Sequence, residues 1–117
     1  MASAQRDRRV VHPRSNTPEA LVRDAFRAAL QNDREAYERI TLPNRDDVGE
    51  EWERFSERAP RYLVSDEPIT FVVTERASAG LSRVVISVRD QQAEGGTTRQ
   101  IRLQRHGSGW RILQNDL

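Results

Sequence analysis

The chain contains no cysteine and no lysine, and only 6% of its residues are aromatic. Without cysteine it cannot form a disulfide framework, a thiolate site or a cysteine-type zinc site. A chain of 117 residues can nevertheless bury enough surface to fold as one domain without such cross-links. It also lacks any stretch of about 20 apolar residues, so the sequence predicts no membrane-spanning helix.

The absence of lysine means that all 19 basic residues are arginine. Arginine codons are rich in G and C, so this bias indicates a bacterial genome of high GC content. A functional alternative is a phosphate- or nucleic-acid-binding surface, since the guanidinium fork fits phosphate. Nucleic-acid-binding domains usually carry a strong basic excess on one face, which a net charge of +1 does not supply. Nucleic acid is therefore not expected as a partner.

The charges are distributed unevenly along the chain. Residues 1–14 carry four Arg against one Asp, and residues 15–60 carry seven Arg against eleven acids. Residues 61–117 carry eight Arg against six acids. An acidic middle and basic ends would help one half of the protein dock on the other half, or on a second copy.

The first 16 residues are polar and rich in arginine, which predicts a flexible arm before a single domain over residues 17–117. We expect that deleting residues 1–14 leaves the melting temperature nearly unchanged, because no apolar pattern there joins the core. The alternative role for the arm is to tether an anionic partner. No apolar signal segment is present, which fits the cytoplasm. A chain from which such a segment had been removed would look the same, so the envelope or periplasm stays open.

Three helices are predicted next. Thr17 is a good N-cap and Pro18 suits the first turn, and an apolar stripe continues to Leu30. Asn32-Asp33 breaks that helix and caps a short second one, from Arg34 to about Ile40.

The third helix is predicted from about Val48 to Ala59. Its apolar stripe consists of Val48, Trp52, Phe55 and Ala59. The charged residues between them, Glu51 included, are expected to face water.

The second half of the chain predicts antiparallel strands joined by tight turns. They are expected at residues 61–64, 69–74 and 81–90, followed by a hairpin over residues 97–115 that folds on Gly107-Ser108-Gly109. Helices followed by strands predict an α+β fold, with three N-terminal helices packed on a curved antiparallel sheet of about four strands. Period-two alternation marks the core face of the strands. The residues expected to be buried together are Leu21, Phe26, Ile86, Leu103 and Trp110.

Three short motifs occur in a characteristic order: Thr17-Pro18-Glu19, Asn32-Asp33 and Gly109-Trp110-Arg111-Ile112. In this order and spacing, residues 17–117 resemble the short bacterial members of the nuclear transport factor 2-like (cystatin-like) superfamily. The resemblance implies a cone, in which the sheet wraps around the long first helix and leaves a mouth that can hold a ligand. It also implies frequent dimers through the sheet. Fold analogy carries no function by itself.

Catalytic members of that superfamily, such as the ketosteroid-isomerase-like enzymes, need a carboxylate base and a hydroxyl or acid donor in an apolar pocket. The polar residues here that could face the cone are Tyr37, Tyr62, Asp66, Glu75 and Asp90. The carboxylates lie at turns or strand ends, which favours a structural role for them. No residue of a family catalytic motif can be carried over, so the catalytic residues are left unassigned.

Two surfaces are candidates for binding. Tyr37, Trp52 and Tyr62 are expected near the mouth of the cone and could bind a ligand, although Trp52 could equally pack a helix on the sheet. The residues Arg83, Val85, Arg89 and Arg102 are expected on the outer face of the sheet. Their mixed composition suits either a modest polar dimer interface or a solvated face.

The sequence predicts neither a metal nor a cofactor. His12 and His106 are isolated and lack acidic neighbours at ligand spacing. There is no nucleophile elbow, no P-loop and no glycine-rich dinucleotide turn.

The sequence therefore favours a non-enzymatic binding or assembly module, expected to be a homodimer. Its other expected partners are a second protein or a small apolar ligand at the mouth. One alternative is a small enzyme of the isomerase, cyclase or hydrolase kind that uses the cone pocket. A less favoured alternative is a binder of an anionic polymer through the arginine-rich arm.

Overall fold

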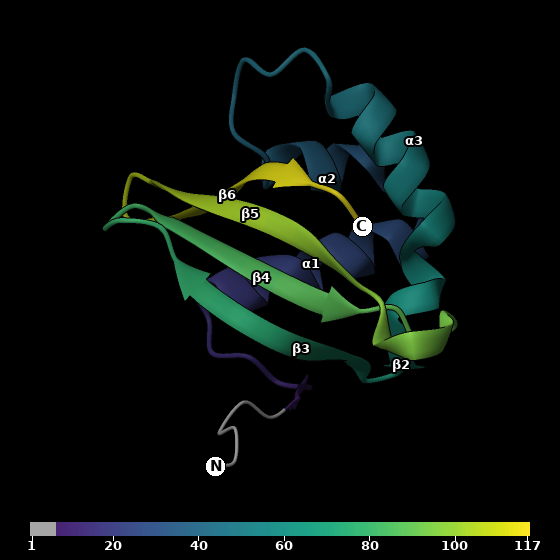
Figure 1. The fold of residues 1–117 in the computed structure, drawn as a ribbon. Helices are drawn as coiled ribbons and strands as arrows, with labels where there is room; N and C mark the ends of the chain where they lie inside the picture. The colour runs from purple at the N-terminus through teal and green to yellow at the C-terminus, as the bar shows by residue number, and fades with distance from the viewer. Residues whose placement is uncertain (1–6) are drawn as a thin grey trace.

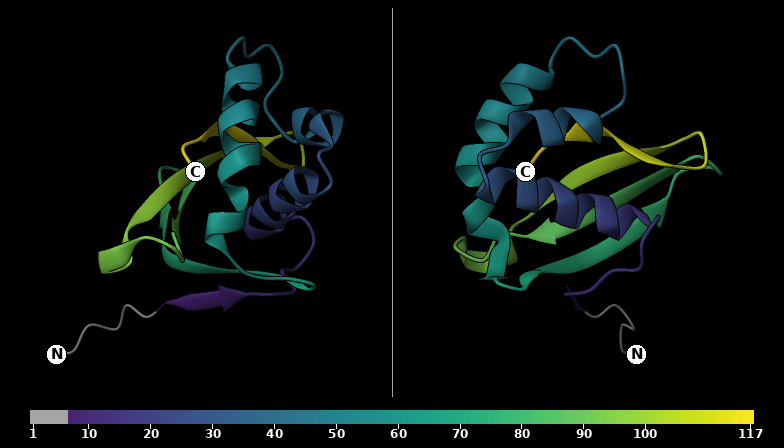
Figure 2. Two further views of the ribbon diagram at one scale, coloured as in Figure 1. Left: turned by 90° about the vertical axis from the view of Figure 1, so that its right-hand side faces the viewer. Right: turned by 180° about the vertical axis from the view of Figure 1, so that it is seen from behind.

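The computed structural model describes residues 7–117 as three α-helices and an open antiparallel sheet of six strands. The helices lie together on one side of the sheet (Figures 1 and 2). This arrangement confirms the predicted α+β class. The sheet has six strands instead of the expected four or so. One of them forms within the N-terminal arm, where no strand was expected, and the other five overlap the predicted strand segments.

The helices begin and end close to the predicted residues: α1 spans Pro18–Leu30, α2 spans Arg34–Arg39 and α3 spans Val48–Arg58. The Thr17 side chain caps α1 by accepting a hydrogen bond from the Ala20 N–H, and Asp33 caps α2 in the same way. Asp47 precedes α3 but makes no capping bond with its side chain. Its carboxylate accepts a hydrogen bond from Arg45 instead, at 3.1 Å.

The sheet is built mostly from consecutive hairpins. Its strands are β1 (Arg8–Val10), β2 (Leu63–Asp66), β3 (Ile69–Ser78), β4 (Arg83–Arg89), β5 (Thr98–His106) and β6 (Gly109–Asn115). The strand expected over residues 61–64 begins later, at Leu63, because residues Ala59–Tyr62 form a 3₁₀ turn, η1. The strands β3, β4, β5 and β6 follow one another across the sheet. The strand β1 pairs with one edge of β3, and both β2 and β4 pair with the other edge. Phe71 pairs with β1 and β2, and Val73 pairs with β1 and β4.

The arm is the main correction to the predicted fold. Arg8, Arg9 and Val10 pair antiparallel with Val73, Val72 and Phe71. Val10 is buried in the hydrophobic core. The structure thus places Arg8–Val10 in the sheet, where a flexible segment was expected, because Val10 enters the core and β3 offers an edge for pairing. Residues 1–6 of the predicted arm lie outside the described residues.

We now expect the arm to contribute to stability. Val10→Ala should lower the free energy of unfolding by about 1–2 kcal/mol, since each buried methylene contributes about 0.8 kcal/mol. Deleting residues 1–10 should cost more, because β3 also loses its edge partner. Urea unfolding followed by far-UV circular dichroism measures both effects. Arg9→Ala, at an exposed position of the same strand, is the control and should change little. An unchanged midpoint after the deletion would show that β1 is not held in solution.

The core lies between the helices and the inner face of the sheet. Phe26, Ile86, Leu103 and Trp110 are all buried in one cluster, as predicted, while Leu21 is only partly buried against it. On β4, the residues Val84, Ile86 and Val88 face this core. The β3–β4 connection turns at Gly80, whose φ of 76° is readily accessible only to glycine.

Candidate functional site

The three residues predicted at the mouth of the cone lie in the interior instead. Tyr37 and Tyr62 have no exposed surface and Trp52 is 6% exposed. The Tyr62 hydroxyl is buried without a hydrogen-bond partner among the described residues, and the Tyr62 ring packs 6.5 Å from that of Phe26, measured between centroids. The ligand-binding role expected for these residues stays a prediction, and their burial does not support it.

Aromatic rings fill the space between the helices and the sheet. The ring of Phe26 lies 5.6 Å from that of Phe55 and 5.2 Å from that of Phe71, measured between centroids. The Tyr37 ring lies 5.3 Å from Trp52 and 5.6 Å from Phe55. These are contact distances for tilted and stacked rings. The site where a cone pocket was expected is therefore occupied by side chains of the protein itself.

A buried carboxylate does lie beside these rings, but hydrogen-bond donors of the protein already occupy both of its oxygen atoms. Glu51 Oε1 accepts a hydrogen bond from the Tyr37 hydroxyl at 2.5 Å, and Oε2 accepts one from Arg45 Nη2 at 2.5 Å. The Asn115 N–H donates to Oε2 at 3.0 Å, and the Asn115 side chain donates to the Tyr37 hydroxyl at 3.0 Å. Glu51 is only 4% exposed. We call Tyr37, Arg45, Glu51 and Asn115 the Glu51 network.

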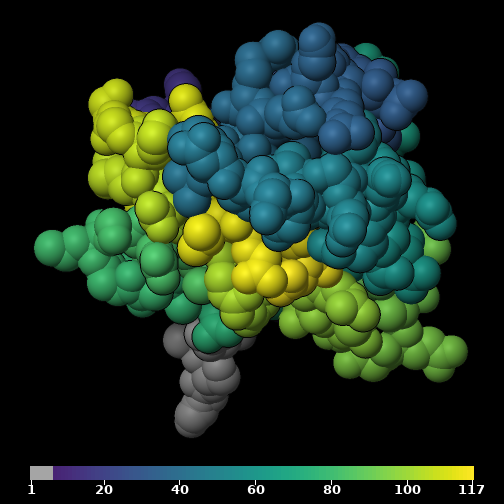
Figure 3. All heavy atoms as spheres, turned by 90° about the horizontal axis from the view of Figure 1, so that it is seen from above, coloured from purple at the N-terminus to yellow at the C-terminus, as the bar shows by residue number. Residues whose placement is uncertain are grey.

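The Glu51 network joins segments that are far apart in the sequence. Tyr37 belongs to α2, Glu51 to α3 and Asn115 to the end of β6, and Arg45 comes from the α2–α3 loop. In Figure 3 the last residues of the chain lie against the α2–α3 segment and α3. Burial, together with the adjacent Glu51 carboxylate, raises the pKa of Tyr37 far above its usual value. The tyrosine therefore stays a neutral donor, and the network serves to lock elements together.

The sequence contained a signal for this network that was misinterpreted. Glu51 was expected to face water, yet it follows Val48 by three residues and precedes Phe55 by four, which places it on the apolar stripe of α3. A carboxylate on the buried face of a helix needs a cationic partner. The cationic partner, Arg45, and the second donor residue, Asn115, could not be assigned from the helical pattern because both come from outside α3.

Two of the other acidic candidates, Asp66 and Asp90, lie at or next to strand ends as predicted, whereas Glu75 lies within β3 because that strand continues to Ser78. Asp90 Oδ1 accepts hydrogen bonds from the N–H groups of Gln92 and Ala93, and Oδ2 accepts one from Arg61. Burial opposes the charged form of Asp90, but these bonds outweigh it and lower the pKa of the carboxyl. Asp66 lies at the exposed end of β2, and Glu75 is exposed on β3. None of the three carboxylates joins the aromatic interior.

The histidines do not come together. His12 is exposed before α1 and His106 is exposed at the end of β5. Among residues 7–117 no group of three or more His, Asp or Glu residues could hold a metal ion. Within the same range, no helix is both long enough and apolar enough to span a membrane.

The four residues predicted for an interface do share one face. Val85 pairs with Arg102 across β4 and β5, and Arg83 and Arg89 lie two and four residues from Val85 on β4. This face of the sheet points away from the helices, because the alternate residues of β4 are in the core. We call it the outer face. Arg89 forms an ion pair with Asp7, and Arg102 forms one with Asp116 at 3.4 Å.

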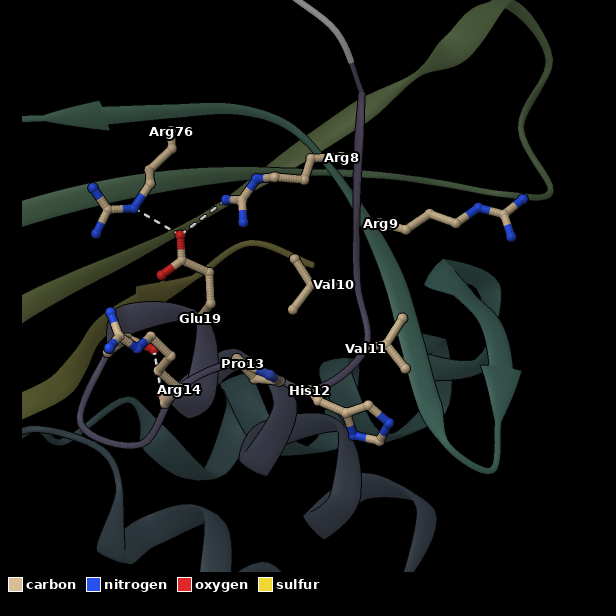
Figure 4. Close-up of a pocket in the computed structure, with 10 residues that line it drawn as sticks. Arg8, Arg9, Val10, Val11, His12, Pro13, Arg14, Glu19 and Arg76 are labelled. Atoms are coloured by element: carbon tan, nitrogen blue, oxygen red, sulfur yellow. Dashed lines mark hydrogen bonds and ion pairs between the residues drawn. The ribbon is translucent and has the colours of Figure 1, made fainter.

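A second surface was not predicted from the sequence. A groove of about 550 Å³ lies between the arm, the start of α1 and β3. Glu19, in the first turn of α1, is 7% exposed and accepts hydrogen bonds from both Arg8 and Arg76. Because this cluster joins residues separated by 11 and 57 positions, local patterns could not reveal it. The lining consists of Arg8, Arg9, Val10, Val11, His12, Pro13, Arg14, Thr17, Glu19 and Arg76 (Figure 4).

Comparison of the chain with protein-family models finds no match. Comparisons with the curated proteins and with the solved structures likewise find no significant match. The resemblance to the nuclear transport factor 2-like superfamily therefore stays a prediction.

Proposed function

We propose that this protein is a non-enzymatic binding module that associates with a second copy of itself through the outer face of its sheet. The observation that carries this proposal is the filled interior. An enzyme of the isomerase, cyclase or hydrolase kind needs a carboxylate that can reach a substrate. Here the interior carboxylate, Glu51, is bound by three donor residues and lies beside closely packed rings.

The charge pattern of the outer face supports pairing with a like surface. Two copies of a face rich in arginine would repel each other if every guanidinium were unpaired. Asp7 and Asp116 neutralise Arg89 and Arg102 within one chain, which reduces that repulsion. Arginine is also enriched at protein interfaces, and a rim of polar residues is usual there. The resemblance to a superfamily that often dimerises through the sheet points to the same face.

The association can be measured by sedimentation equilibrium. We expect the wild-type chain to show twice its 13.5 kDa mass. Val85→Arg adds a charge at the centre of the outer face, next to Arg102, and should weaken association about 100-fold, because like charges brought together across an interface cost several kcal/mol. Far-UV circular dichroism would check that the variant still folds.

Leu30→Arg is the matched control for this experiment. It adds the same charge at an apolar side chain that is 38% exposed, on α1 in the helix layer. Its association should equal that of the wild type. A wild-type chain that stays at monomer mass at every accessible concentration would contradict the proposal, as would equal weakening by both substitutions.

A further inference from the structure

The groove beside the arm gathers positive charge around one buried carboxylate. Four arginines line it, Arg8, Arg9, Arg14 and Arg76, and the only acidic residue in its lining is Glu19. Figure 4 shows Arg8, Arg14, Glu19 and Arg76 on one side of the arm, while Arg9 points to the other. Three arginines thus surround a single carboxylate, which leaves an excess of positive charge at this place.

Glu19 fixes the orientation of two of these arginines. Its Oε2 atom accepts a hydrogen bond from Arg8 Nη2 at 3.1 Å and another from Arg76 Nε at 2.7 Å. The Glu19 side chain is 10% exposed, whereas Arg8 is 55% exposed and Arg76 is 40% exposed. A guanidinium carries several N–H donors, so each arginine keeps donors at the surface of the groove after binding Glu19. Arginines held in place in this way lose little side-chain freedom when a ligand binds.

We propose that this groove binds a phosphate group carried by a small molecule, with Arg8, Arg76 and Arg14 as its donors and Glu19 as a positioning residue. The planar guanidinium fork matches the oxygen atoms of phosphate and forms charge-assisted hydrogen bonds with them. A dianionic group balances the positive charge that Glu19 leaves uncompensated. The site lies on the helix side of the sheet, so it does not depend on self-association through the outer face.

Isothermal titration of pyrophosphate into the full chain, at ionic strength held constant with chloride, tests this proposal. We expect saturable binding to one site with a dissociation constant of about 1 mM or tighter. Arg76→Gln should weaken binding about tenfold or more, because it removes charge-assisted donors. Arg14→Gln should also weaken the binding of pyrophosphate. Arg14 forms no hydrogen bond or ion pair with Glu19, so this variant leaves the pairs of Glu19 with Arg8 and Arg76 in place.

Arg83→Gln is the control, since it removes an equal charge from an exposed arginine of the outer face. Its affinity for pyrophosphate should match that of the wild type. Equal weakening by Arg83→Gln and Arg76→Gln would show attraction to net charge alone and would overturn the proposal. The absence of saturable binding would also overturn it. A single-stranded oligonucleotide that binds with steep salt dependence, while pyrophosphate does not bind, would overturn it in favour of a phosphate polymer.

Discussion

Glu51→Leu should lower the free energy of unfolding by about 3–5 kcal/mol, the usual cost of removing one partner from a buried ion pair. The substitution keeps the side chain similar in size but takes from Arg45, which is 11% exposed, its buried carboxylate partner. Arg45 then keeps only the exposed carboxylate of Asp47 as an ion-pair partner. It also removes the acceptor for the Tyr37 hydroxyl and the Asn115 N–H. Three donors would then be left without their carboxylate in the interior. Urea unfolding of wild type and variant at neutral pH measures the difference.

A double-variant comparison separates the ion pair from simple loss of packing. Replacing a whole buried pair by apolar residues often costs little, so Arg45→Met combined with Glu51→Leu should be more stable than Glu51→Leu alone. Glu50→Leu, at the exposed neighbouring position, should change stability by no more than about 0.5 kcal/mol. If Glu51→Leu unfolded at the same urea concentration as the wild type, the network would not hold α2, α3 and β6 together.

Phe26→Ala should also destabilise the protein by about 3–5 kcal/mol, because truncating a buried aromatic ring leaves a cavity. Phe26 has no exposed surface. Its ring meets those of Phe55, Tyr62 and Phe71, which come from α3, η1 and β3. Thermal unfolding should show a fall of roughly 4 °C for each kcal/mol lost in a domain of this size.

A second substitution at Phe26, which leaves a larger side chain than alanine, provides the comparison. Phe26→Leu should cost clearly less than Phe26→Ala, because much of the ring volume is kept. Leu81→Ala, at a hairpin position that is 99% exposed, should leave the melting temperature nearly unchanged. A gain of ligand binding in Phe26→Ala without loss of stability would mean that the interior tolerates an open pocket, against the packing described above.

The helices and most strands could be predicted because their signals are local. The stripe on α1 and the caps Thr17 and Asp33 act within a few residues, and the alternation on β4 acts within one strand. The strand at Arg8–Val10 could not be predicted, because a single valine gives no pattern and its pairing depends on β3, about 60 residues away. The Glu51 network and the groove around Glu19 could not be predicted for the same reason, because the residues that bind Glu51 and Glu19 come from separate elements.

The burial of the three residues expected at the mouth of the cone could not be predicted, for a different reason. Tyr37, Trp52 and Tyr62 were assigned to a mouth from the resemblance, yet large amphipathic rings are equally suited to an interior. Only the packing of the helices on the sheet decides between these uses. The predicted outer-face residues, by contrast, depended on alternation alone, and the structure places all four on one face.

On both sides of the sheet, the chain itself covers part of a strand edge. At one edge β1 pairs with β3. At the other, the segment after α2 runs beside β6, where the Leu42 N–H donates to the Ile112 carbonyl and the Ile112 N–H donates to the Ile40 carbonyl. An uncovered strand edge is a template for adding foreign strands, and long exposed edges promote aggregation. Proteolytic trimming of the arm would therefore do more than shorten the protein, since it would uncover β3 and create a surface on which copies could join edge to edge into fibrous aggregates.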